Sequence, residues 1–170
     1  MDIEAGSFHC VALKRNGTVV TWNRAFANYS DPYELGDVMD VAAGEKHGLA
    51  LKIEGTVVTW GKIGDVDVTQ PRGLRDVIAV AAGDNISVAL RNDGSVVTWG
   101  ADGVIQSTSH GNVVAISGAQ NDTIALNRGG TVAGDYPVPA GLKEVVAIAS
   151  GNSHGLALFG PDHVREGKAQ

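Results

Sequence analysis

The sequence lacks several features that mark particular classes of protein. Among its 170 residues there is one cysteine, Cys10, so no disulfide framework can form within one chain. No apolar run reaches the length that spans a bilayer. Residues 1–4 lack the basic-then-apolar order of a secretory signal. We therefore expect a cytoplasmic protein, or a piece of a larger one, that does not engage a membrane.

Clusters of basic residues and catalytic motifs are also missing. The 13 Lys and Arg residues are scattered among 19 Asp and Glu residues, whereas nucleic-acid binding needs clustered positive charge. There is no nucleophile elbow, no phosphate-binding glycine loop and no zinc spacing. The acidic pair Asp65 and Asp67 supplies too few oxygen ligands for a calcium loop. We expect no enzymatic activity, no cofactor, no metal and no nucleic-acid partner.

What the sequence does contain is a repeat. The stretch VAAGEKHGLALKIEGTVVTWG (41–61) recurs at 80–100 and 3–22, with weaker copies at 117–132 and 148–158. Alignment on a shared Ala-Leu pair gives steps of 38, 39, 36 and 32 residues between Leu13, Leu51, Leu90, Leu126 and Leu158. Such a period signals a repeat architecture. We place the units at 1–36, 37–75, 76–111 and 112–143, with a partial unit at 144–170, in one domain.

Each unit predicts β-strands joined by tight hairpins. An Ala/Gly-rich run (38–44, 77–83, 145–151) is followed by a second apolar run (47–52, 87–91) and then by a Thr-Val-Val-Thr-Trp type of run (18–22, 56–60, 95–99). Turn pairs that favour positive φ separate the last two runs: Asn16-Gly17, Glu54-Gly55, Asp93-Gly94 and Gly129-Gly130. The strands are rich in β-branched residues, and the hairpins make the sheets antiparallel.

We predict an all-β fold, a β-propeller of four to five antiparallel blades. Valines point to both faces of the third run, so both faces of each sheet need cover, which blades stacked around an axis supply. The small residues of the first run suit an inner strand near that axis. A β-sandwich is the alternative, but it does not require a strict repeat. The ring is either small and closed or an open arc whose edges pair with a second chain, and we favour the homodimer.

These residues resemble the repeats of the regulator of chromosome condensation, a β-propeller family. The resemblance lies in VAAGEKHGLALK followed by EGTVVTWG, and in VPAGLKEVVAIASG at 138–151. The short spacers look like those of bacterial members, among them the propeller-shaped inhibitor of β-lactamase. The chain lacks the Gly-Gln-Leu-Gly segment of the founding member, and it holds at most five units where well-known members close seven blades. The resemblance implies small-GTPase binding or nucleotide exchange, as an alternative to the protein-binding scaffold that variable loops on a regular frame indicate.

Two recurring residue types are interpreted as structural. His9, His47 and His154 occupy one repeat position, where a ring of imidazoles is a candidate metal site, but they fall on separate blades. The resemblance implies that this histidine bonds to the backbone near a turn. Trp22, Trp60 and Trp99 also share one position, and a recurring aromatic in a strand is more often a packing residue than a ligand platform.

Two sets of residues are candidates for partner binding. The turns between the first and second runs vary while the frame does not, and they contribute Phe8, Lys46, Asn85 and Asn121. The irregular segment 23–36 contributes residues of the kind enriched at interfaces, namely Arg24, Phe26, Tyr29 and Tyr33. The alternative for the first set is that these turns are simply solvated. The alternative for the second set is that its aromatic residues pack on their own blade. We expect a non-enzymatic scaffold for protein–protein interaction, or else a structural self-assembling module.

Overall fold

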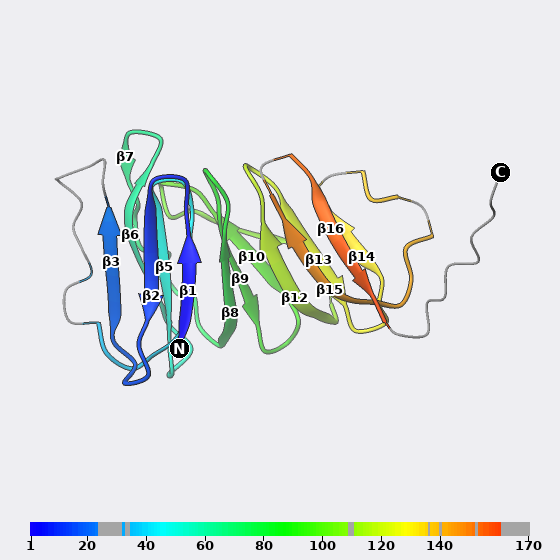
Figure 1. The fold of residues 1–170 in the computed structure, drawn as a ribbon, viewed down its shortest axis with the longest axis horizontal. Helices are drawn as coiled ribbons and strands as arrows, with labels where there is room; N and C mark the ends of the chain where they lie inside the picture. Colours follow the sequence, from blue (N-terminus) through cyan, green and yellow to red (C-terminus); the bar gives the residue numbers. More distant parts are fainter. Residues whose placement is uncertain are drawn as a thin grey trace.

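The computed structural model describes residues 1–23, 32, 35–108, 111–135, 137–139, 141–151 and 153–160. Every regular element within these residues is a β-strand, and no helix among them is long and apolar enough to cross a membrane. The strands form five antiparallel sheets that stand side by side in chain order (Figure 1). The prediction of an all-β propeller is confirmed, with five blades arranged in an arc that does not close.

The strands follow the repeat. Blade 1 holds β1 (Asp2–Ala5), β2 (His9–Leu13) and β3 (Val19–Asn23). Blade 2 holds β4 (Val38–Ala43), β5 (His47–Lys52), β6 (Val57–Ile63) and β7 (Val66–Asp67). Blade 3 holds β8 (Val77–Ala82), β9 (Ser87–Arg91), β10 (Val96–Trp99) and β11 (Ile105–Thr108). Blade 4 holds β12 (Val113–Gly118), β13 (Thr123–Asn127) and β14 (Val132–Gly134), and blade 5 holds β15 (Val145–Ser150) and β16 (Gly155–Phe159).

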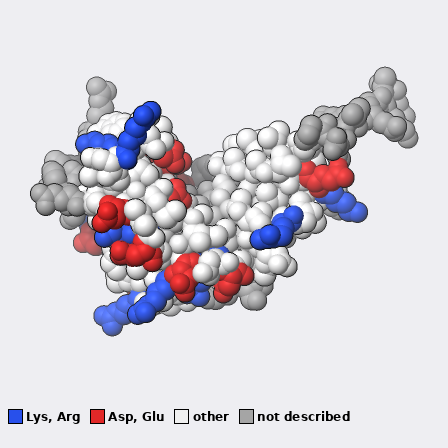
Figure 2. Space-filling model, turned by 90° about the horizontal axis from the view of Figure 1, so that it is seen from below, with Lys and Arg blue, Asp and Glu red and all other residues white. Residues whose placement is uncertain are grey.

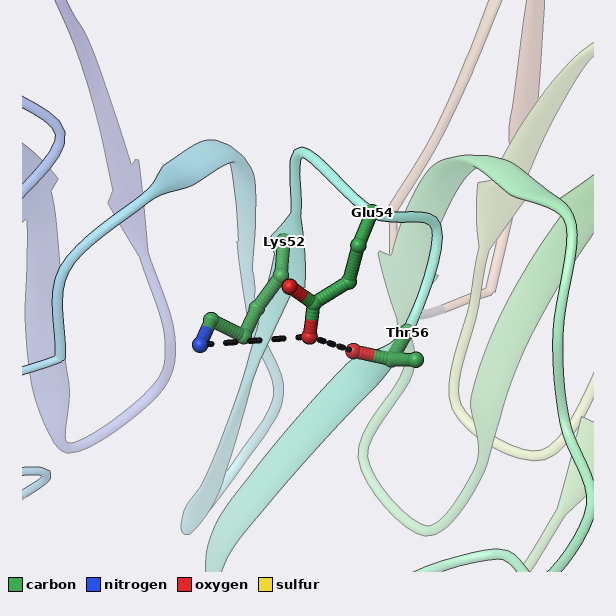
Figure 3. A network of polar contacts seen from close by, with 3 residues as sticks. All are labelled: Lys52, Glu54 and Thr56. Carbon is green, nitrogen blue, oxygen red and sulfur yellow. Dashed lines mark hydrogen bonds and ion pairs between the residues drawn. The ribbon is translucent and has the colours of Figure 1, made fainter.

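The hairpins between second and third strands turn as the sequence predicts. Gly17, Gly55, Gly94 and Gly130 have φ of 78°, 79°, 80° and 74°, a region that only glycine enters freely. In blade 2 the Thr56 hydroxyl donates a 2.9 Å hydrogen bond to the carboxylate of Glu54, which also pairs with Lys52 at 3.9 Å (Figure 3). Asn16 and Asp93 accept the equivalent hydroxyl bonds, so the same side-chain contact closes three successive turns.

These turns also connect each blade to the next. The carbonyl of Gly17 accepts a hydrogen bond from the N–H of Val38 at 3.1 Å, and Gly55 does the same for Val77. The residue before the inner strand adopts positive φ in blades 2 to 5, at Asp37, Asp76, Asn112 and Glu144. A register shift follows within the first residues of each of these inner strands. The repeat therefore encodes the junction between blades as well as the blades themselves.

Apolar side chains fill the space between blades. Leu49 and Leu51 on β5 lie in one buried cluster with Ala89 on β9 and with Val97 and Trp99 on β10. Buried clusters of apolar side chains also join blade 1 to blade 2, and blade 3 to blade 4. In these three contacts the earlier blade presents leucine and valine, and the facing side of the later blade presents alanine and valine, with tryptophan added in blades 2 and 3.

Small residues near the axis are required by crowding. A Cβ atom added at Gly44 would come within 2.5 Å of the carbonyl oxygen of Gly83 in the next blade. One added at Gly83 would overlap the carbonyl oxygen of Ala119, and one added at Gly6 would overlap that of Gly44. The glycines at the ends of the inner strands are therefore steric requirements of the converging blades.

The two end blades each leave one face uncovered. Trp22 on β3 is 48% exposed, whereas Trp60 and Trp99 at the same repeat position are 7% and 1% exposed. On the last blade, Leu156 and Leu158 of β16 are both 62% exposed. These exposures show that the first and last blades do not pack against each other as neighbouring blades do.

Candidate protein-binding face

The turns between first and second strands gather at one mouth around the axis. A cavity of about 240 Å³ is lined there by residues from all five blades. Its walls are the strand-end glycines and their neighbours, including Gly6 and Ser7, Gly44, Gly83 and Asp84, Ala119 and Gln120, and Gly151. The sequence places the varied turn residues directly after these glycines. The frame thus holds the described loops of the first four blades, which differ in sequence, in a fixed arrangement on one face.

Neighbouring loops are joined in pairs by their side chains. The ammonium of Lys46 lies 5.9 Å from the centre of the Phe8 ring, a cation–π contact between blades 2 and 1. The side-chain amide Nδ2 of Asn85 donates a 3.0 Å hydrogen bond to the side-chain Oδ1 of Asn121, which joins blades 3 and 4. The Asn85 N–H also donates to the carbonyl of Gln120 at 2.9 Å. The four loop residues that the sequence singled out therefore occur as two contacting pairs.

Phe8 is an exposed aromatic residue on this face. It is 43% exposed, and Lys46 beside it forms a 3.9 Å ion pair with Glu45. The backbone carbonyl of Lys46 accepts a hydrogen bond from the N–H of Lys62 on β6, which fixes this loop to its own blade. An aromatic ring with an adjacent cation on a fixed loop is a suitable anchor for a protein surface.

A polar groove continues from the mouth along the inner strands. It has a volume of about 300 Å³, and its lining includes Glu4, Asp40, Ser117 and Ser150. The hydroxyls of Ser117 and Ser150 lie 2.6 Å apart, across blades 4 and 5. Most other lining residues are alanine, glycine or valine, so these four polar side chains set the chemistry of the groove.

The two carboxylates in this groove are partly desolvated. Burial raises the pKa of Asp40, opposed by the N–H groups of Val80 and Val41 that donate to its carboxylate, while the charge of Asp2 raises it further. Burial also raises the pKa of Glu4, and the charges of Asp2 and Asp40 add to the effect. Sequence reasoning missed this group. The sequence does contain one indication of it: Glu4 is acidic, whereas three other repeats have alanine at the equivalent positions 42, 81 and 149.

The recurring histidines lie beneath the loops rather than in them. His47 is fully buried, and its Nε2 lies 3.2 Å from the hydroxyl of Ser87 in the next blade. Burial and the charge of His9 lower the pKa of His47 to about 4, partly offset by the backbone of Ile86. Burial lowers the pKa of His9 as well. His154, in the last blade, is exposed.

The glycine before each histidine provides the space for its ring. An added Cβ at Gly44 would overlap the His47 ring, and one at Gly151 would lie 2.5 Å from the ring of His154. Gly48 provides space for the Trp60 ring in the same way, because an added Cβ at Gly48 would overlap that ring. Among the described residues, no group of three or more His, Cys, Asp or Glu side chains is placed to hold a metal ion.

The other predicted contact residues lie outside the described part of the chain. This applies to Arg24, Phe26, Tyr29 and Tyr33, all of which belong to the irregular segment after β3.

Charged side chains of both signs are interspersed on the face shown in Figure 2, and no large area of a single sign is present there.

Comparison with protein families identifies one repeat directly. Residues 77–106, which include β8, β9 and β10, match the regulator of chromosome condensation (RCC1) repeat. The resemblance drawn from the sequence is thereby confirmed. At the level of sequence, no curated protein matches the chain.

Several solved structures share the fold. The CRINKLY WD40 ectodomain of the receptor kinase ACR4 from Arabidopsis thaliana superimposes with a TM-score of 0.76 at 18% identity, covering 94% of this chain and 61% of that one. Yeast RCC1 (Prp20), solved bound to Kap60, gives 0.71 at 19% identity, covering 93% and 53%. Human WBSCR16 gives 0.72 at 18% identity, covering 93% and 58%. The chain thus spans about half to three-fifths of the length of these structures, and such identities show the fold alone.

Proposed function

We propose that this chain, a propeller that carries the RCC1 repeat, is a non-enzymatic scaffold whose axial loop face binds another protein. By axial loop face we mean the turns that contain Phe8, Lys46, Asn85 and Asn121. The observation that carries the proposal is that turns of different sequence surround one mouth on a backbone of repeated geometry. Recognition sites are commonly placed on such loops of a rigid frame.

The pairing of the loop side chains supports this proposal. The Lys46–Phe8 and Asn85–Asn121 contacts hold polar and aromatic groups in place before a partner arrives. Ordering side chains on binding costs about 0.5–1.5 kcal/mol each, so loops that are already fixed lose less affinity to this cost. The propellers of similar fold agree with a protein partner: yeast Prp20 is solved bound to Kap60, and another structure of it is described together with its binding to Gsp1p and histones.

Paired variants test the proposal. A partner recovered with the wild-type chain is compared with Phe8→Ala/Lys46→Ala and with Asn85→Ala/Asn121→Ala, and we expect the first pair to weaken binding at least tenfold. The matched control is Glu54→Ala, in the turn at the opposite end of the strands, where an exposed ion pair contributes less than about 1 kcal/mol. If both loop variants bind as tightly as wild type while remaining folded, the axial loop face is not the binding surface.

The segment 23–36 is the competing surface. The triple variant Phe26→Ala/Tyr29→Ala/Tyr33→Ala separates the two, because it leaves the axial loops unchanged. Loss of the partner with this variant alone would assign binding to the segment. Loss with Phe8→Ala/Lys46→Ala alone would assign it to the axial loop face.

Nucleotide exchange on a small GTPase is an alternative that the fold likeness to yeast Prp20 favours. It predicts accelerated release of fluorescent nucleotide from a panel of small GTPases when the chain is added. Release at the intrinsic rate across the panel would remove this alternative and would leave the scaffold proposal standing.

Self-assembly is a second candidate function, favoured by the uncovered apolar faces of blades 1 and 5. Sheets with one bare apolar face are a common basis for association. Sedimentation at several concentrations tests it, because a self-assembling chain shows a mass that rises with concentration, whereas a strict monomer stays at 17.5 kDa.

A further inference from the structure

The two uncovered faces are the two different halves of one contact. Between blades 2 and 3, Leu49 and Leu51 of the earlier blade pack on Ala89, Val97 and Trp99 of the later one, and all five are buried. The contacts between blades 1 and 2 and between blades 3 and 4 have the same polarity, with leucine and valine on the earlier blade and alanine and valine on the later one. Tryptophan belongs to the later face in blades 2 and 3.

The last blade carries the aliphatic half. Leu156 and Leu158 stand at the repeat positions of Leu49 and Leu51, which are fully buried. Both leucines of the last blade are 62% exposed. We call these two residues the aliphatic end face.

The first blade carries the tryptophan half. Ile3, Val20 and Trp22 stand at the positions of Val80, Val97 and Trp99, and Ala12 stands at that of Ala89. Ile3 and Trp22 are 64% and 48% exposed, while Val80 and Trp99 are buried. We call Ile3, Ala12, Val20 and Trp22 the tryptophan end face.

We propose that a second copy of this chain docks head to tail, with the aliphatic end face of one copy against the tryptophan end face of the other. The inference rests on the proposed self-assembly and specifies its geometry. The contact would bring together the residue types that the chain already buries between blades 2 and 3, so the chemistry of the two faces is matched. None of the six side chains is charged, so the contact buries no ionised group.

The competing arrangement is a dimer whose two-fold axis passes through the contact itself, and it matches less well. It would place leucine against leucine, or tryptophan against tryptophan, a pairing that none of the internal contacts uses. In the head-to-tail arrangement each copy keeps one free face of each kind after the first contact. Such a contact repeats until it closes a ring, or else it extends as a filament.

Complementary variants distinguish these arrangements. Leu156→Glu/Leu158→Glu disables the aliphatic end face, and Trp22→Glu disables the tryptophan end face, each at exposed positions. In sedimentation equilibrium the wild-type chain is expected to show a mass above 17.5 kDa that rises with concentration. Each variant alone should stay at the monomer mass. An equimolar mixture should form a dimer and nothing larger, because one intact face of each kind remains.

Controls keep the test decisive. Ile78→Glu is the matched control, because Ile78 is exposed and apolar but lies on neither end face, and it should assemble as wild type does. Circular dichroism checks that each variant is folded, and Val20→Lys replaces Trp22→Glu if that variant is not. Assembly that survives either end-face variant alone, or a mixture that does not restore association, would overturn the head-to-tail geometry while leaving self-assembly intact.

A wild-type chain that stays monomeric at every concentration would overturn both the geometry and self-assembly. The end faces would then contact further blades of a longer polypeptide, or another protein, instead of a second copy of this chain. The axial loop face proposal would be unaffected, since its variants lie on a different surface.

Discussion

The three tryptophans offer a graded test of the blade arrangement, because they share one repeat position but differ in burial. Trp99 is 1% exposed, and Trp99→Ala removes its ring from the buried cluster that it shares with Leu49 and Leu51 of the neighbouring blade. A buried aromatic covers about 200 Å² of surface, which at about 25 cal/mol per Å² corresponds to roughly 5 kcal/mol. Alanine retains part of this, so we expect a loss of about 4 kcal/mol of unfolding free energy, within the range measured for such truncations.

Trp22 should behave differently. It is 48% exposed, and its ring borders solvent, so Trp22→Ala removes about half of the buried area and leaves no closed cavity. The expected loss is about 1–2 kcal/mol. Trp60, which is 7% exposed, should resemble Trp99.

Urea unfolding followed by circular dichroism measures these differences through linear extrapolation, at a concentration low enough to exclude association. The expected order of destabilisation is Trp99→Ala, then Trp60→Ala, then Trp22→Ala. Equal losses for Trp22→Ala and Trp99→Ala would refute the reasoning, because they would mean that the first blade is covered like the others and that the arc is closed.

Two further predictions concern the interior. The pKa of His47 is lowered from 6.5 to about 4. Between these two pH values the unfolded state binds a proton on this side chain that the folded state does not bind. The free energy of unfolding should therefore fall by up to roughly 3 kcal/mol as the pH drops from about 6.5 to about 4. Denaturant titrations across this window test the slope, which His47→Gln should flatten. At the axis, Gly83→Ala places a Cβ onto the carbonyl of Ala119 and should cost at least about 2 kcal/mol, while Gly129→Ala meets no atom within 4 Å and should be nearly neutral in thermal unfolding.

Much of the fold follows from local residue chemistry. The hairpins at Gly17, Gly55 and Gly94 are predictable because the turn requires positive φ, and the structure shows φ near 80° at each. The repeat length and the β-branched runs fix the strands to within a few residues. The small residues of the inner strands predict convergence at an axis, and the contacts at Gly44 and Gly83 give the steric reason.

The site is less predictable, because it depends on distances between blades. Lys46 and Phe8 belong to different repeats, and only the packing of blade 2 on blade 1 brings the ammonium 5.9 Å from the ring centre. Asp40 looks like an ordinary polar strand residue in the sequence, yet its carboxylate reaches the N–H of Val80 in the next blade. The exposure of Trp22 likewise depends on what stands beside the first blade, which the repeat pattern leaves open.

The most direct test of the account is a hydrogen-exchange footprint of the chain bound to its protein partner. We predict slowed exchange in the turns at residues 6–8, 44–46, 83–86 and 119–122, which surround the axial mouth. The hairpin turns at the other end of the strands, residues 14–18, 52–56, 91–95 and 127–131, should exchange as they do in the free chain. Protection of those hairpin turns, with the axial turns unchanged, would contradict the account.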